Sequence, residues 1–185
     1  MNFSTEHEPL EGLIALAHHR WNIPVIAELE RQSGAKFVSL ANRLGVSRGS
    51  LTASLSDLID LGLVQRNSGH GHPLRPEYLL TEQGQRIGQH CNKISRLVAK
   101  RREEKLAYSK WTLPLVAAIG NGASRFNEVR DSLPVATPRA IALGLKSLTH
   151  YQWADRSIID DYPPAAGYIL LPKGERIWSS VNELI

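Results

Sequence analysis

An internal repeat at a spacing of 90 residues limits the folds open to this chain more than any other feature of its sequence. Arg20–Val25 (RWNIPV) matches Lys110–Leu115 (KWTLPL), and Gly84–Ile87 matches Gly174–Ile177. Further matches lie between these pairs in the same order, with one short stretch at a spacing of 89. Collinear matches at nearly constant spacing indicate a duplication, and two copies are too few for a solenoid. We therefore expect two small domains of one kind.

The composition is that of an ordinary globular protein, with 42% hydrophobic and 22% charged residues. No apolar run approaches the roughly 18–20 residues that span a bilayer, and the polar, acidic start does not resemble a secretory signal. The single cysteine, Cys91, excludes an internal disulfide. We expect a cytoplasmic protein that does not associate with a membrane. A net charge of +4 permits nucleic acid as a partner without requiring it.

The first copy contains three consecutive segments with apolar residues at helical spacing. Trp21–Arg31 is expected to form the first helix, and residues 37–44 a second, short one. Ser47 is well placed to cap a third helix, because a serine oxygen can accept a hydrogen bond from a free amide of the first turn. The buried stripe of this third helix is expected at Leu51, Leu55, Leu58 and Ile59.

The second copy repeats this order of helices. Trp111–Ile119 is expected to form its first helix, and Phe126 to Leu133 its second. Thr137 is expected to cap the third helix, which has Pro138 in its first turn. Its buried stripe is expected at Ile141, Leu145 and Leu148, which leaves Arg139, Ala142, Leu143 and Lys146 away from the core.

A two-stranded hairpin is predicted after the third helix of each copy. In the first copy Leu63–Arg66 and Glu77–Leu80 flank a loop rich in Gly, His and Pro, and Thr81 then caps another helix. In the second copy the strands are Trp153–Ile159 and Gly167–Leu171, around a tip with two aspartates and two prolines. The chain is therefore predicted to be mainly α with small β-hairpins: tandem winged helix-turn-helix domains related by internal duplication.

The predicted domains are an N-terminal segment or helix at 1–17, a first winged-helix domain at 18–90, a linker helix at 91–107 and a second winged-helix domain at 108–185. In such a domain the third helix can enter a DNA major groove, and the hairpin, or wing, can contact the backbone or the minor groove. The candidate DNA-contacting residues lie on the third helix and the hairpin of each copy. In the first copy they are Ser47, Arg48, Ser50, Thr52 and Ser54 on the third helix, and Arg66, His70, His72 and Arg75 on the hairpin. In the second copy they are Thr137, Arg139, Ala142, Lys146 and Arg156.

The second copy resembles the HxlR-type winged-helix regulators, which are related to the MarR group. The resemblance covers about residues 108–180 and rests on Lys110–Leu113 (KWTL), Arg125–Arg130 (RFNEVR), Thr137–Ile141 (TPRAI) and the Pro163-Pro164 pair before Tyr168. The first copy is similar over about residues 18–90. The resemblance implies a bacterial or archaeal transcription regulator. From the repeated winged-helix order we expect it to bind DNA, more often as a repressor, and to act in the cytoplasm at the nucleoid. Members usually form homodimers with one unit per chain, so this chain is either an internal pseudo-dimer or one that associates further.

Other classes of function find little support in the sequence. No phosphate-binding glycine loop, HExxH pair or glycine-flanked nucleophilic serine is present, so we expect neither an enzyme nor a cofactor. His70 and His72 lack further metal ligands, so no metal site is expected. The acidic second hairpin leaves one alternative open, a protein-interaction module in which one or both copies no longer bind DNA. No signature identifies an effector.

Overall fold

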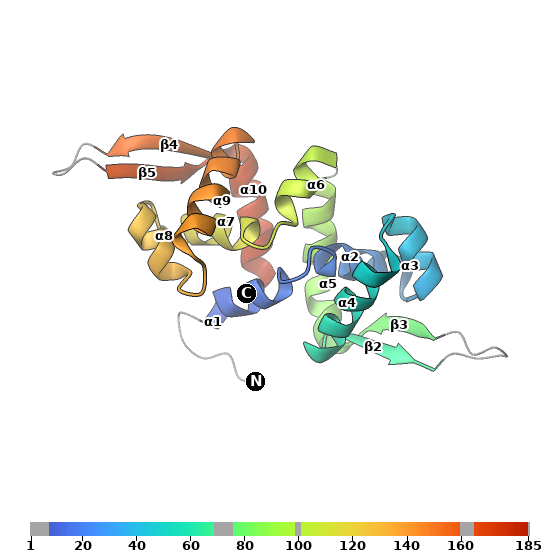
Figure 1. The fold of residues 1–185 in the computed structure, drawn as a ribbon. Coiled ribbons are helices and arrows are strands. Elements are labelled where there is room, and N and C mark those ends of the chain that lie inside the picture. The colour runs from blue at the N-terminus through green and yellow to red at the C-terminus, as the bar shows by residue number, and fades with distance from the viewer. Residues whose placement is uncertain (1–7, 69–75, 99–100, 160–164, 185) are drawn as a thin grey trace. The chain divides into compact units, whose positions relative to one another are not determined.

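The structure is a computed structural model, and it describes residues 8–68, 76–98, 101–159 and 165–184 (Figure 1). Within these residues, no helix has the length and apolar character needed to cross a membrane. The chain divides into two compact units. The N-terminal unit is His18–Arg96, and the C-terminal unit combines Met1–Ala17 with Leu97–Ile185.

The N-terminal unit has the order of elements that was predicted for a winged helix. Its three antiparallel strands lie in the order β1-β3-β2, and Arg66 pairs with Tyr78 across the hairpin. The two-residue strand β1 was not predicted, because so short a segment shows no alternation. The elements are α2 (Asn22–Gln32), β1 (Ala35–Lys36), α3 (Phe37–Leu44), α4 (Arg48–Asp60), β2 (Val64–Asn67), β3 (Glu77–Leu80) and α5 (Glu82–Leu97), whose last residue belongs to the C-terminal unit.

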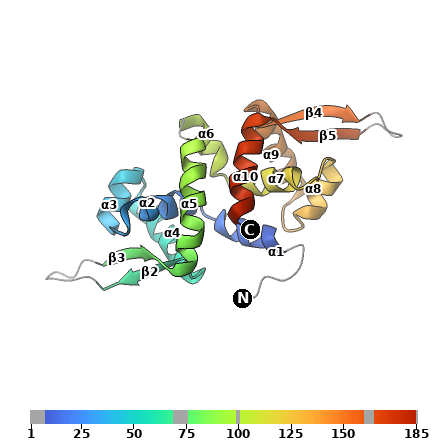
Figure 2. The ribbon, with the colours of Figure 1, turned by 180° about the vertical axis from the view of Figure 1, so that it is seen from behind.

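The C-terminal unit repeats this plan and adds two helices to it. Its wing is a two-stranded sheet in which Arg156 pairs with Tyr168, the counterpart of the Arg66–Tyr78 pair. α10 lies at the back of this unit in Figure 1 and at its front in Figure 2, which shows the ribbon from behind. The elements are α1 (Glu8–Leu16), α6 (Arg101–Ala107), α7 (Thr112–Gly120), α8 (Phe126–Ser132), α9 (Pro138–His150), β4 (Ala154–Ile159), β5 (Ala165–Leu170), α10 (Pro172–Val181) and a 3₁₀ turn at Asn182–Leu184.

The cores of both units confirm the predicted stripes of the third helices with one exception. Leu51, Leu55 and Leu58 are at most 2% exposed, and so are Ile141, Leu145 and Leu148. Each such burial contributes about 1.5–3 kcal/mol. The exception is Ile59, which is 38% exposed. It lies one position beyond the buried Leu58, at the edge of the apolar face of α4.

The predicted caps fix where these helices begin. The side chains of Ser47 and Thr137 accept hydrogen bonds at 3.2 Å from the amides of Ser50 and Ala140. Thr81 accepts a bond at 3.1 Å from the amide of Gly84 at the start of α5. α4 and α9 therefore start at equivalent positions, since Ser47 and Thr137 are 90 residues apart.

The prediction of one linker helix over 91–107 was wrong. α5 ends at Leu97, and α6 starts at Arg101. The carbonyl oxygen of Leu97 accepts a hydrogen bond at 2.5 Å from Nζ of Lys173, which also pairs with Glu103 at 3.2 Å. A side chain distant in sequence thus satisfies the carbonyl at the end of α5, an interaction that local periodicity cannot reveal.

The N-terminal helix α1 is part of the C-terminal unit. It packs against α7, and its Leu13 and Leu16 are 1% and 5% exposed. At the repeat spacing of 90, α1 corresponds to residues 98–106, the region of α6, which also contacts α7. Both helices that precede the repeats are therefore built into one unit, although α1 precedes that unit's other helices by more than 80 residues.

Candidate nucleic-acid interface

Helix α4 presents a polar face to solvent in the N-terminal unit. Arg48, Ser50 and Thr52 are exposed on this face, beside the exposed cap Ser47. The hydroxyl of Thr52 donates to the carbonyl of Arg48 at 2.9 Å, and that of Ser47 donates to the Ser50 hydroxyl at 2.9 Å. A small polar surface with one arginine permits a close approach to phosphates and base edges.

Ser54 does not belong to this face, and its prediction as a DNA contact was wrong. It is 0% exposed, and its hydroxyl has no hydrogen-bond partner among the described residues. With Leu51, Leu55 and Leu58 it completes the spacing i, i+3, i+4, i+7 that marks one side of a helix. That spacing should have identified Ser54 as part of the core.

Ser54→Ala is expected to stabilise the protein by about 1 kcal/mol, because it removes a buried hydroxyl that makes no hydrogen bond to any described residue. Chemical denaturation measures this change. DNA affinity should stay unchanged, whereas a loss of affinity in a protein of undiminished stability would return Ser54 to the interface.

Two partly buried polar contacts hold α3 and α4 against α2. Nδ2 of the fully buried Asn22 donates to Oδ2 of Asp57 in α4 at 2.6 Å. The carboxylate of Glu28, 6% exposed, accepts from Arg43 in α3 at 3.0 Å and from Arg31 in its own helix. These contacts fix the orientation of the helix-turn-helix, which a protein that reads a groove requires.

The first wing carries Arg66, which is exposed on β2 opposite Tyr78. The other predicted wing residues, His70, His72 and Arg75, lie outside the described residues. So do the aspartates and prolines predicted at the tip of the second wing.

In the C-terminal unit, the exposed face of helix α9 is more apolar than that of α4 and carries two cations. Arg139, Ala142 and Lys146 are exposed, together with the cap Thr137. Leu143, which we did not include among the candidates, is 55% exposed on the same helix. An exposed leucine and alanine can contact a thymine methyl group, and the two cations can contact phosphate or guanine.

The N-terminus of α8 places an aromatic ring beside α9. The carboxylate of Glu128 accepts hydrogen bonds from the amides of Arg125 at 2.9 Å and Ser124 at 2.8 Å. These bonds hold the pKa of Glu128 below its usual value, with the Arg125 amide the larger cause. The capping box starts α8 at Phe126 and thereby fixes the position of its ring.

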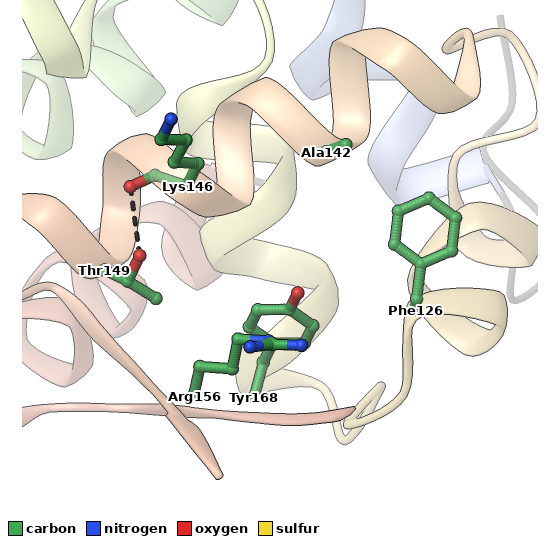
Figure 3. A pocket seen from close by; sticks show the side chains of 6 residues that line it. All are labelled: Phe126, Ala142, Lys146, Thr149, Arg156 and Tyr168. Atoms are coloured by element: carbon green, nitrogen blue, oxygen red, sulfur yellow. Dashed lines mark hydrogen bonds between the residues drawn. The ribbon is translucent and has the colours of Figure 1, made fainter. Parts of the chain in front are cut away.

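A pocket of about 280 Å³ lies between α8, α9 and the second wing (Figure 3). Two predicted cations line it, Lys146 from α9 and Arg156 from β4. Phe126, Ala142, Thr149 and Tyr168 complete its walls. Phe126, Thr149 and Tyr168 were not among the predicted site residues, because no sequence pattern places residues of α8, α9 and β5 around one pocket.

Comparisons with known proteins agree with the tandem architecture. The HxlR-like helix-turn-helix family matches residues 16–105 and again residues 106–185, which together make up nearly the whole chain. Family and fold define a winged helix-turn-helix, DNA-binding transcription regulator, a class whose members are generally not enzymes. The chain belongs to the HxlR-like helix-turn-helix family and contains two copies of its domain.

Two similar solved structures each align with less than half of the chain. One is a protein assigned to the MarR family of transcriptional regulators from Porphyromonas gingivalis W83, with 24% identity over 45% of this chain and 82% of that chain and a TM-score of 0.42. The other is the reduced form of the transcriptional regulator YodB from B. subtilis, with 22% identity over 43% and 78% and a TM-score of 0.40. No curated protein matches the chain.

Proposed function

We propose that the chain regulates transcription by binding a specific double-stranded DNA sequence with both of its units, and that it acts as a repressor. The observation that carries this proposal is the duplicated pair of capped helices, α4 and α9, each exposing polar and basic residues beside a wing arginine. One chain thus offers two recognition helices, as a homodimer of one-copy chains would. A repressor of this kind would act by occupying a promoter.

The two recognition helices differ in the residues that they would present to DNA. Arg48 is the first residue of α4, but α9 has Pro138 at that position and its arginine one residue later. Ser50 and Thr52 on α4 correspond to Ala140 and Ala142 on α9. Different side chains at equivalent positions favour different bases, so the proposed operator is asymmetric rather than palindromic.

Arg48→Ala and Arg139→Ala should each weaken binding to a duplex selected from a random pool by about 1–3 kcal/mol, or roughly 5- to 150-fold, if each arginine contacts a base. Fluorescence anisotropy at fixed salt measures the loss. Arg86→Ala removes the same charge from the exposed face of α5 and should have little effect. Unchanged affinity in both interface variants would refute the assignment of these arginines.

A second candidate function is a protein-docking module, as the exposed apolar side chains of the C-terminal unit favour. Leu143, Ile158 and Ile169 are 55%, 78% and 55% exposed. A gel-shift assay of the full chain with random duplexes at low salt separates the two functions. Because phosphate contacts give every DNA-binding protein some nonspecific affinity, the absence of any retained duplex would favour protein docking.

A further inference from the structure

We propose that the pocket between α8, α9 and the second wing binds a phosphate group, and that the described residues of the N-terminal unit form no equivalent site. The argument starts from charge. Lys146 and Arg156 reach the pocket from different elements, and neither forms an ion pair within the described part of the chain. Two cations beside one cavity, with no ion pair to a described residue, create a positive potential that attracts an anion.

The shape and lining of the pocket suit a small oxyanion. A volume of about 280 Å³ holds several waters, at about 30 Å³ each, and therefore also a phosphate group. Arg156 and Tyr168 are direct partners across the β4–β5 hairpin, and Figure 3 shows the Tyr168 hydroxyl pointing from the strand toward α9. A guanidinium presents a planar pair of donors to phosphate, and a lysine adds a mobile ammonium. The partly buried rings of Phe126 and Tyr168 form apolar walls beside the two cations, and charge contacts are stronger next to apolar surface than in open water.

The N-terminal unit lacks this combination of residues. It retains the arginine and the tyrosine, as Arg66 and Tyr78, but Ser56 stands at the position of Lys146, and Ile59 at that of Thr149. At this place the first copy therefore has one cation where the second has two. The two copies can therefore be compared directly, because the hairpin arginine occurs with Lys146 in the second copy and with Ser56 at the equivalent position in the first.

The phosphate group has two possible sources, and both involve the recognition surface. α9 and the wing form the walls of the pocket, so under the proposed function a backbone phosphate of bound DNA can enter it. A free phosphate or phosphate ester in the same place would compete with that DNA contact. Only the first source rests on the proposed function.

The test combines one binding experiment without DNA and one with it. Without DNA, titration calorimetry with inorganic phosphate, at ionic strength fixed with chloride, compares the wild-type chain with Lys146→Ser and Arg156→Gln. With DNA, the affinity of the selected duplex is measured across a salt series for the same proteins. Arg176→Ser is the matched control, because it removes one exposed charge from α10, away from the pocket lining.

If free phosphate is a ligand, the wild-type chain and Arg176→Ser bind it, and both pocket variants bind it at least tenfold more weakly. If the ligand is a DNA phosphate only, inorganic phosphate gives no signal, while both pocket variants lower duplex affinity severalfold and reduce the salt slope by about one. Either result supports the site. The proposed phosphate site is overturned if neither phosphate binding nor duplex binding depends on Lys146 and Arg156. A wild-type chain that binds no duplex refutes the proposed function, and the phosphate titration then decides on the pocket alone.

Discussion

Replacing Gly84 or Gly174 by alanine is expected to destabilise the corresponding unit by about 3 kcal/mol or more, a large part of the stability of a small domain. A Cβ at Gly84 would overlap with the carbonyl oxygen of Leu63, and one at Gly174 with that of Trp153. A backbone oxygen cannot rotate away as a side chain can. Either the start of the helix or the start of the wing strand must therefore move.

The same carbonyl groups are fixed by hydrogen bonds that join the wing to the helix after it. The amide of Thr81 donates to the Leu63 carbonyl at 3.1 Å, and that of Leu171 donates to the Trp153 carbonyl at 2.9 Å. The substitution thus acts at equivalent points of both units. Denaturant unfolding followed by hydrogen exchange would locate the loss in residues 18–96 for Gly84→Ala and in the C-terminal unit for Gly174→Ala.

Gly49→Ala is the control for these variants, because nothing lies within 4 Å of a Cβ at Gly49, in the first turn of α4. It should be neutral or stabilise the protein by about 0.5 kcal/mol, as alanine favours a helix over glycine. Equal stabilities for all three alanine variants would contradict the close packing of helix on wing.

Leu13→Ala is expected to destabilise the C-terminal unit by about 2–5 kcal/mol. Leu13 is 1% exposed where α1 packs against α7, so the truncation leaves a cavity in a core that α1 shares with residues from the other end of the chain. Hydrogen exchange should increase in α7 while α2 of the N-terminal unit stays protected. Glu11→Ala, at an exposed position of the same helix, should change neither the stability of the C-terminal unit nor the hydrogen exchange of α7.

The opposite pattern, faster exchange in α2 with α7 unaffected, would contradict the assignment of α1 to the C-terminal unit. The packing of α1 also has a practical consequence for experiments on separate copies. A fragment that starts after residue 97 lacks two buried leucines of its own core, Leu13 and Leu16. Variants of the full chain are therefore the better tools for separating the contributions of the two units.

The repeat and the apolar periodicity were enough to predict most of the fold. Both rest on local or collinear information, and they gave the order of helices, the caps Ser47 and Thr137 and the buried stripes of α4 and α9. The repeat also paired Gly84 with Gly174 without giving the reason, which is the carbonyl group that occupies the space of a Cβ at both positions.

Long-range contacts account for most of what the sequence could not show. The break between α5 and α6 coincides with a contact from Lys173, and the place of α1 depends on α7. The pocket needs residues from α8, α9 and both wing strands, which no spacing rule brings together. Ser54 is different, because helical periodicity did place it on the buried side, and only its polar character suggested the surface.

The central claim, that both units read DNA, is tested most directly by a base-by-base specificity profile. Every position of the selected duplex is substituted in turn, and affinities are measured for the wild-type chain, Arg48→Ala and Arg139→Ala. We expect two separate blocks of sensitive positions, with specificity relaxed in one block by Arg48→Ala and in the other by Arg139→Ala. A single block, or a profile that neither variant alters, would contradict the account.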